Sequence, residues 1–497
     1  MAASSSRLDP ALRDHAVVIG GSMAGLLAAR ALASHFTRVT LIDRDHFPAA
    51  AEFRKGVPQS RHVHVLLARG AEIIEQLMPG MKAELIAAGA VTFEWPTHAL
   101  WYTPRGWSRR FHPGIPVISC SRELLEWHVR QRVAALPNVR LLEGQEAVRL
   151  LGETDQGRIS GVSLRARGAI DGAPGTIEDI PAQLVVDASG RNSRTPEWLE
   201  ALGYQRPEEM QVNAFLGYAT RDYAIPSAFT ADWQVIYLQA LPPASTRLGG
   251  LFPIEGNRWR VGIEGVGRDY PPTDDAGFLE FARSLRSPIL YETIRDAEPL
   301  TPIHGFQRTE NQRRFYEHLT RLPDGLLATG DALCAFNPIY GQGMTAAAQD
   351  ALILDQLLHQ RQGNLIGLGH AFHRAASKSN AGAWLMATGE DLRYPSTVGG
   401  KRDLPTRLIH RYLDRVIRVA TEDPGVNTAF TNVIQLVSPP TSLFKPRVLF
   451  PALLRGGAPP ITQPPQVLDG AAETAGYRSP AASISAATSE SAVKLPS

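Results

Sequence analysis

The chain has 497 residues, 44% of them hydrophobic and 20% charged, which is the balance of a globular protein with a sizeable core. A formal net charge of +2 gives no sign of a nucleic-acid partner, and the two cysteines, Cys120 and Cys334, are too few for a disulfide framework or a cysteine zinc site. No segment approaches the roughly 18 consecutive apolar residues of a membrane-spanning helix, and the first residues lack a signal-peptide pattern. We therefore expect a cytoplasmic protein without membrane association.

The first elements predict a parallel sheet. After residues 1–14, which we expect to form a disordered leader, an apolar strand over residues 15–20 leads into an alanine- and leucine-rich helix over 23–34. A second apolar strand follows over 38–43, and this strand–turn–helix–strand order is typical of a parallel sheet with crossover helices. A further helix is predicted over residues 122–135, and further buried strands over 182–187 and 325–329.

The pattern changes in the middle of the chain. Residues 247–266 predict an antiparallel hairpin that turns at Glu255-Gly256-Asn257, and residues 276–297 predict helix. Helices are also predicted over 345–359 and 403–421, before a stretch rich in Pro, Ala, Ser and Thr. We therefore predict an α/β fold with a discontinuous Rossmann-type nucleotide-binding domain (15–200 and 300–360), an inserted mixed or antiparallel β-sheet lobe for substrate (201–299), a helical C-terminal region (361–455) and a flexible tail (456–497).

The first motif is VVIGGSMAG, residues 17–25, between the first strand and the first helix. Gly20 permits a tight turn, Gly25 lets the helix pack closely on the sheet, and the helix N-terminus offers free N–H groups to a pyrophosphate. Ser22 replaces the middle glycine of the usual fingerprint, although serine is small and donates hydrogen bonds to phosphate. A chance glycine turn is the alternative interpretation.

Asp43 ends the second strand 23 positions after Gly20. An acidic residue about 20 positions after the first glycine accepts hydrogen bonds from a ribose diol in dinucleotide-binding folds. The alternative is a turn cap, because aspartate is common just after strands. The position of the glycine turn favours the ribose role.

Residues 325–358 form a longer composite pattern. A strand delivers Asp331, which can accept hydrogen bonds from the ribityl hydroxyls of a flavin. Pro338 and the turn Gly341-Gln342-Gly343-Met344 then lead into a helix whose N-terminus can stabilise negative charge on the pyrimidine edge of a reduced flavin. Glycines are needed there because the backbone must touch the ring.

Two more segments lie beside the predicted nucleotide site. Asp187 and Gly190 end another strand in LVVDASGRNSR (residues 184–194), and Arg122 opens its helix where it can reach the cofactor from the other side. An ordinary charged residue at a helix start is the alternative for Arg122.

These four segments together resemble the group A flavoprotein monooxygenases, a superfamily that also includes geranylgeranyl reductases and flavin-dependent halogenases. More narrowly, RKGVPQSRHVHVLLARG (54–70), DASGRNSR and AFNPIYGQGM are similar to the flavin-dependent epoxidases of polyether polyketide biosynthesis. The similarity covers most of the chain to about residue 350. It implies noncovalently bound FAD, O2 as co-substrate, and NAD(P)H as the electron source.

The resemblance also implies which residues hold FAD. They lie on the two glycine turns, at strand ends and on the loops between them, and Ser22 and Asp43 depart from the family's more usual glycine and glutamate. The set comprises Gly20, Ser22, Met23, Ala24, Gly25, Asp43, Arg44, Arg54, Arg122, Asp187, Gly190, Asp331, Pro338, Gly341, Gly343 and Met344.

No side chain is a certain catalytic residue, because in this family the flavin carries the oxidation. Arg61, His62 and His64 are candidates, since the family brings residues 54–64 near the flavin and the substrate entrance. Purely structural histidines are the alternative. We predict no metal, because His62 and His64 have no further ligands in the sequence.

The resemblance implies that a flavin hydroperoxide transfers one oxygen atom to an apolar natural-product intermediate, a polyketide or a terpenoid, by alkene epoxidation. A hydroxylase, a Baeyer–Villiger-type oxygenase, a geranylgeranyl reductase-like alkene reductase or dehydrogenase, and a non-catalytic lipid carrier are the alternatives. A halogenase is disfavoured because its tryptophan–x–tryptophan–x–isoleucine–proline signature is absent. With no second glycine-rich nucleotide motif, either NAD(P)H docks transiently or a separate flavin reductase delivers the electrons.

An apolar substrate needs an apolar cavity, and the sequence offers aromatic residues that can line one. Core packing is the alternative for most of them. The candidates are Trp95, Trp101, Trp107, Tyr223 and Trp233.

Overall fold

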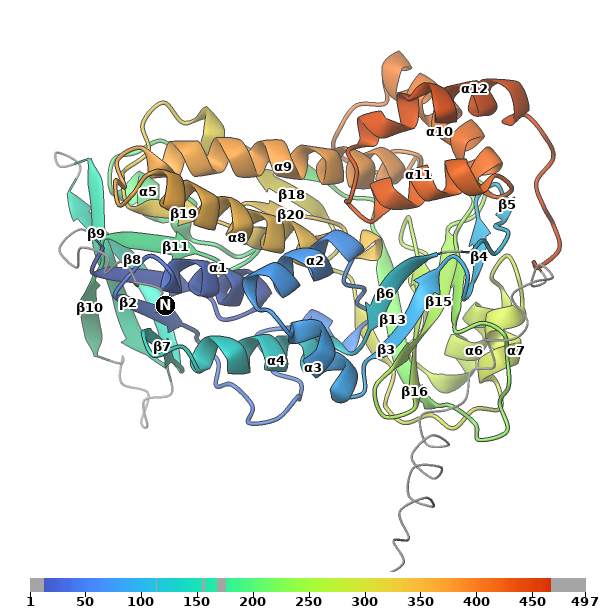
Figure 1. The fold of residues 1–497 in the computed structure, drawn as a ribbon, viewed down its shortest axis with the longest axis horizontal. Coiled ribbons are helices and arrows are strands. Elements are labelled where there is room, and N and C mark those ends of the chain that lie inside the picture. The colour runs from blue at the N-terminus through green and yellow to red at the C-terminus, as the bar shows by residue number, and fades with distance from the viewer. Residues whose placement is uncertain (1–12, 113, 154–156, 168–175, 466–497) are drawn as a thin grey trace, which may run out of the picture.

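The computed structural model describes residues 13–112, 114–153, 157–167 and 176–465. The predicted leader, except its last two residues, and the tail beyond residue 465 lie outside the described residues. Figure 1 shows two lobes side by side, with a group of C-terminal helices above the second.

The first lobe is built on a five-stranded parallel sheet, as predicted. In spatial order its strands are β19 (Leu326–Ala328), β11 (Leu184–Asp187), β1 (His15–Ile19), β2 (Arg38–Ile42) and β7 (Val139–Leu142). The strands consist of apolar runs, as expected for a parallel sheet that is covered by helices. The helices of this lobe are α1 (Met23–Ala33), α2 (Ala68–Leu77), α3 (Met81–Ala87), α4 (Arg122–Ala134), α5 (Thr195–Ala201), α8 (Gly343–Gln360) and α9 (Leu368–Asp391).

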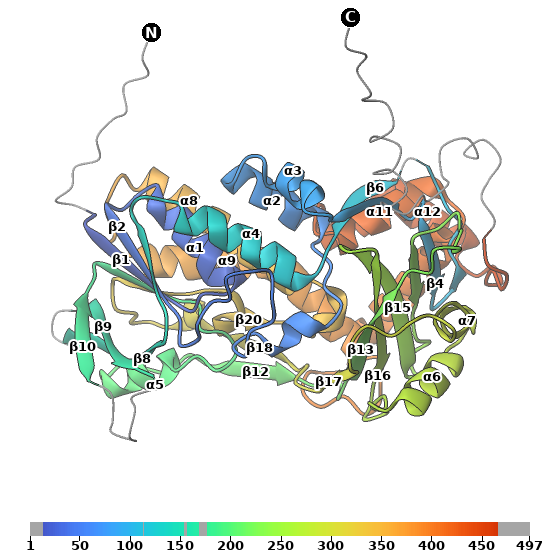
Figure 2. The same cartoon turned by 90° about the horizontal axis from the view of Figure 1, so that it is seen from below.

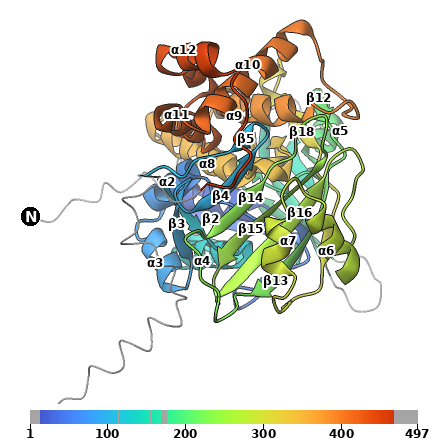
Figure 3. The same ribbon diagram turned by 90° about the vertical axis from the view of Figure 1, so that its right-hand side faces the viewer.

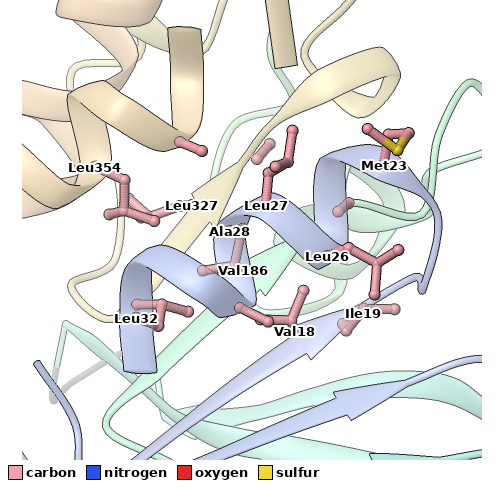
Figure 4. Close-up of a cluster of buried hydrophobic side chains, with 14 of the residues drawn as sticks. Val18, Ile19, Met23, Leu26, Leu27, Ala28, Leu32, Val186, Leu327 and Leu354 are labelled. Atoms are coloured by element: carbon pink, nitrogen blue, oxygen red, sulfur yellow. The ribbon is translucent and has the colours of Figure 1, made fainter. Parts of the chain in front are cut away.

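Helix α1 lies between this sheet and α8. Leu26 and Leu27 of α1 are fully buried against Val18, Val186 and other apolar side chains of the strands, together with residues of α8 (Figure 4). Helices α1 and α8 therefore share one core, and residues of the first turn of each line the same cavity.

Two small antiparallel sheets flank the large one. Their strands, in spatial order, are β10 (Ile177–Pro181), β9 (Arg158–Ala166) and β8 (Gln145–Glu153) in the first, and β12 (Glu209–Val212), β18 (Asn311–Arg314) and β20 (Cys334–Ala335) in the second.

The second lobe contains a seven-stranded sheet. The hairpin predicted over residues 247–266 is present as β15 and β16, which pair in antiparallel register around Gly256. The spatial order is β17 (His304–Phe306), β13 (Gly217–Ala224), β16 (Arg258–Gly265), β15 (Arg247–Ile254), β14 (Val235–Leu238), β4 (Ala99–Thr103) and β5 (Gly106–Trp107).

This sheet includes strands from both sides of residue 200, where we predicted the boundary between the nucleotide-binding domain and the substrate lobe. Strand β4 pairs in parallel with β14, so a segment expected in the first lobe contributes to the second. The chain on either side of β4 and β5 forms a further antiparallel pair, β3 (Val91–Trp95) and β6 (Ile115–Ser119). The helical stretch predicted over 276–297 forms two helices that lie against the sheet, α6 (Asp275–Arg283) and α7 (Ile289–Ile294), and Pro288 precedes the second (Figure 3).

The C-terminal region is helical, as expected. Its last three helices form a small apolar core of their own and are α10 (Leu404–Ala420), α11 (Pro424–Ile434) and α12 (Pro446–Arg455). Among the described residues, no helix is both long and apolar enough to cross a membrane.

Candidate active site

A cavity of about 460 Å³ lies between the two lobes. Figure 2 shows the arrangement of the two lobes from below. One wall consists of loops at the carboxyl ends of the parallel strands β1, β2, β11 and β19. The opposite wall comes from β13, β16 and β17 of the second sheet, and residues 54–65 run between the two walls. Open α/β sheets bind their ligands at this end of the strands.

The first glycine turn has no space for side chains. Gly20 has φ +104°, and a Cβ added there would lie 2.4 Å from the carbonyl oxygen of Ala188. A Cβ added at Gly25 would lie 1.7 Å from the carbonyl oxygen of Gly20. The two glycines thus bring the first turn of α1 directly against the end of β1, with its free N–H groups at the cavity.

Ser22, Arg54 and Arg122 are joined by Glu126, a buried residue of α4 that the sequence analysis missed. The Ser22 hydroxyl donates to Oε2 of Glu126 at 2.9 Å, and the guanidinium groups of Arg122 and Arg54 donate to the same carboxylate at 2.8 and 3.0 Å. Burial alone would raise the pKa of Glu126, but Arg122 and Arg54 lower it below the ordinary value. Glu126 therefore stays charged and holds both arginines beside the glycine turn. The Arg122–Glu126 spacing of four residues in one helix was the available signal.

Asp43, at the end of β2, also contacts the first glycine turn. Its Oδ2 accepts a hydrogen bond from the backbone N–H of Gly21 at 2.7 Å and lies 3.3 Å from the Arg54 guanidinium. Its Oδ1 accepts from the backbone N–H of Asp45 at 2.8 Å, which is the turn-cap role. Each carboxylate oxygen can accept two hydrogen bonds, so Asp43, which lines the cavity, can still accept one from a ribose diol.

The second glycine segment lines the same cavity and lies beside the first turn of α1. Asp331 follows β19 in a short 3-10 turn, is 39% exposed, and its carboxylate lies 3.7 Å from the Arg191 guanidinium. A Cβ added at Gly330 would lie 2.5 Å from the side chain of Ala24, so this turn also packs closely on α1. The carboxylate of Asp331 is free to accept from a ligand.

Two buried carboxyl groups support this segment from behind, and both escaped the sequence analysis. Asp350 of α8 accepts from the hydroxyl of Thr329 at 3.0 Å, and burial raises its pKa to about 6. Asp391 of α9 accepts from the Asn337 amide at 3.0 Å and from the Tyr340 hydroxyl at 2.9 Å, and burial raises its pKa to about 7. They anchor the loop that precedes α8.

Most residues predicted to hold FAD meet at this cavity. Gly25 and Asp187 do not line it: Gly25 packs against the strand end, and Asp187 is fully buried and accepts hydrogen bonds from the hydroxyls of Ser189, Ser193 and Thr195. The residues that do line it are Gly20, Ser22, Met23, Ala24, Asp43, Arg44, Arg54, Arg122, Gly190, Asp331, Pro338, Gly341, Gly343 and Met344.

Of the three catalytic candidates, His62 and His64 line the cavity, whereas the Arg61 guanidinium lies 3.5 Å from the centre of the Phe53 ring and does not. Nδ1 of His62 lies 2.9 Å from the Thr220 hydroxyl. Burial lowers the pKa of both histidines to about 3, so both are neutral near pH 7.

The neutral state of His62 has a consequence for stability. Unfolding exposes an imidazole with a pKa near 6.5, so the unfolded chain binds the proton first and stability falls as pH drops from about 6.5 toward 3. Between pH 7 and pH 5 we expect this residue to cost about 2 kcal/mol of unfolding free energy. Denaturant unfolding with saturating FAD should show a smaller pH dependence for His62→Gln, whereas the exposed-site control His46→Gln should match the wild type. Equal pH dependence in all three proteins would contradict the assignment.

The aromatic residues proposed for a substrate cavity are not brought to this one. Trp95 and Trp101 pack together in a separate apolar cluster, and Trp107 and Tyr223 belong to the core of the second lobe, against which Trp233 packs. Other aromatic side chains line the cavity instead, namely Trp198, Tyr218, Phe306 and Phe336. Within the described ranges, no group of three or more His, Cys, Asp or Glu side chains could hold a metal ion.

The cavity fits FAD by the chemistry of its donors and acceptors. Two glycine turns allow close backbone approach, two helix N-termini present N–H groups, and Asp43 and Asp331 line the cavity with carboxyl groups.

Comparison with known proteins points the same way. Residues 14–361 match a family model described as FAD binding domain. "Protein Rv3254" of Mycobacterium tuberculosis is 33% identical over 428 residues, which cover 83% of this chain and 87% of that protein. Kynurenine 3-monooxygenase of Salinispora tropica is 26% identical over 70% of this chain and 73% of its own length. Mitochondrial squalene epoxidase 2 of Arabidopsis thaliana is 23% identical over 69% of this chain and 53% of its own length.

Proposed function

Because this chain belongs to the FAD binding domain family, and two of its relatives are named as a monooxygenase and an epoxidase, we propose that it is an FAD-dependent monooxygenase. Its reaction would insert one oxygen atom of O2 into an apolar substrate, by epoxidation of an alkene. The observation that carries the proposal is the convergence of both glycine turns, Asp43 and Asp331 on one cavity whose far wall is aromatic.

Each part of the cofactor has residues suited to it. The turn from Gly20 to Ala24 would receive the pyrophosphate, Asp43 the ribose diol and Asp331 the ribityl chain, while Gly341 to Met344 would lie along the ring. Bound FAD supplies the oxygen activation, which no protein side chain can perform. NAD(P)H, bound transiently or used by a separate reductase, would supply the electrons.

The two histidines of the cavity favour an alkene over a substrate that must lose a proton to a histidine base. His62 and His64 have a pKa of about 3 and are weak bases. An alkene reacts through its π electrons and needs no general base. Tyr218 and Phe306, stacked with ring centres 5.4 Å apart, add an apolar surface that excludes water. We extend the proposal to polyketide or terpenoid intermediates as the substrate class.

The test is oxygen labelling. Holoenzyme supplied with NADPH and a flavin reductase is given a set of apolar polyenes under ¹⁸O2, and products are analysed by mass spectrometry. We expect each product molecule to contain one labelled oxygen atom, and the amount of product to be proportional to the NADPH consumed. NADPH-dependent loss of the double bond without oxygen, under anaerobic conditions, would instead establish an alkene reductase.

Replacing Asp331 with alanine tests the ribityl site. Loss of a charged acceptor should weaken FAD binding at least tenfold, so the purified variant should lose most of its flavin. Asp331→Asn, which keeps one acceptor oxygen, should lose less, and Asp296→Ala at an exposed surface position should lose none. FAD occupancy is read from the flavin absorbance per protein, and full occupancy in Asp331→Ala would contradict this placement.

A further inference from the structure

One carboxyl group in the cavity wall is not among the residues that we propose to hold FAD. Glu264 lies on β16 opposite Tyr218 of β13, and it lines the cavity. Its neighbour two positions earlier is Gly262, where an added Cβ would lie 2.9 Å from Oε1 of Glu264 and 3.1 Å from the Val63 side chain. The glycine therefore leaves the space into which the Glu264 carboxyl extends.

This carboxyl group has no partner in the part of the chain that the structure describes. Its Oε2 is buried without a hydrogen bond, and it forms no ion pair. Arg260, on the same strand, forms ion pairs with Asp222, at 2.8 Å, and with Glu123, at 3.2 Å, and not with Glu264. Burying a polar group without a partner costs free energy. Because Glu264 lines the cavity, a ligand bound there can supply the hydrogen bond that the protein does not.

The surroundings of Glu264 determine whether its carboxyl group is protonated when a ligand binds. Burial alone raises the pKa of Glu264 to about 8, because no cation nearby stabilises the carboxylate. Near pH 7 most of the molecules therefore carry a protonated carboxyl group, which donates a hydrogen bond from its O–H. An acceptor without a charge suits this donor, beside the aromatic rings of Tyr218 and Phe306.

We propose that Glu264 is a specificity-determining residue that donates a hydrogen bond to a neutral carbonyl oxygen of an otherwise apolar substrate. The proposal rests on the proposed function, because it places the substrate in the cavity that also holds FAD. It adds to that function a chemical class, an apolar molecule with a carbonyl group, and a fixed point from which that molecule is oriented.

Two probes test it: 1-tetralone and tetralin, which share a bicyclic skeleton and differ by one carbonyl oxygen. Their binding to the holoenzyme is measured by calorimetry for the wild type, Glu264→Gln and Glu264→Met. Glutamine keeps a donor, whereas methionine keeps the length and removes the donor. Glu280→Met, at an exposed position of α6, is the matched control.

We expect the wild type, Glu264→Gln and Glu280→Met to bind the ketone about tenfold more tightly than the hydrocarbon, and Glu264→Met to bind both equally. A wild type without this preference, whether or not it binds tetralin, would overturn the proposal, as would a preference that survives in Glu264→Met. FAD content is measured on the same samples. A protein without FAD would contradict the proposed function, whereas equal affinities in a protein that holds FAD would contradict only the role of Glu264.

Discussion

Replacing Gly25 with alanine should destabilise the protein by about 3 kcal/mol and prevent it from retaining FAD. The added methyl carbon would lie 1.7 Å from the carbonyl oxygen of Gly20, which is backbone and cannot rotate away. Helix α1 would have to move away from β1, and the N–H groups that we propose to bind the pyrophosphate would move with its first turn. Urea unfolding gives the stability and flavin absorbance gives the occupancy.

The control is the same substitution in a helix that has room. Gly389 of α9 has no atom within 4 Å of an added Cβ, so Gly389→Ala should be neutral or stabilise the helix by about 0.5–1 kcal/mol. If Gly25→Ala folds with wild-type stability and full FAD occupancy, the close approach of α1 to β1 is not required.

Replacing Glu126 with alanine should cost about 3–5 kcal/mol of unfolding free energy, because it leaves the buried Arg54 and Arg122 without their shared carboxylate. Asp43 would still pair with Arg54, but Arg122 would lose its ion-pair partner in the structure. FAD should then bind more weakly, since both guanidinium groups line the cavity.

Glu126→Gln should lie between the wild type and Glu126→Ala, because the amide oxygen still accepts one hydrogen bond. Glu72→Ala removes an exposed ion pair with Arg69 and should change stability by less than about 0.5 kcal/mol. A loss for Glu126→Ala no larger than that of Glu72→Ala, measured by urea unfolding, would show that the buried network does not stabilise the fold.

The parts of the fold that follow from local sequence were predicted correctly. The β1–α1–β2 unit depends on apolar runs and on the glycines Gly20 and Gly25, and the β15–β16 hairpin depends on a turn at Gly256. In both cases the residues that determine the structure are close together in the sequence. The parallel pairing of β4 with β14 joins strands more than 130 residues apart, and nothing local specifies it.

In the candidate site, too, the residues with a local sequence signal were predicted and the others were not. Asp331 and the turn at Gly341 carry their own signals, because they follow a strand or precede a helix. Asp391 has no such signal: its partners Asn311 and Asn337 lie 80 and 54 residues away, and only the folded chain brings them together. Aromatic side chains are equally ambiguous, since burial in a core and exposure in a cavity have the same sequence pattern.

The most direct test of the account is the visible absorption spectrum of the purified protein, with its FAD content after release by heat or acid. We expect close to one FAD per chain, released intact because it is held without a covalent bond. A colourless protein that takes up no FAD when the cofactor is added would contradict the assignment of the cavity, and with it the oxygenase chemistry proposed for this chain.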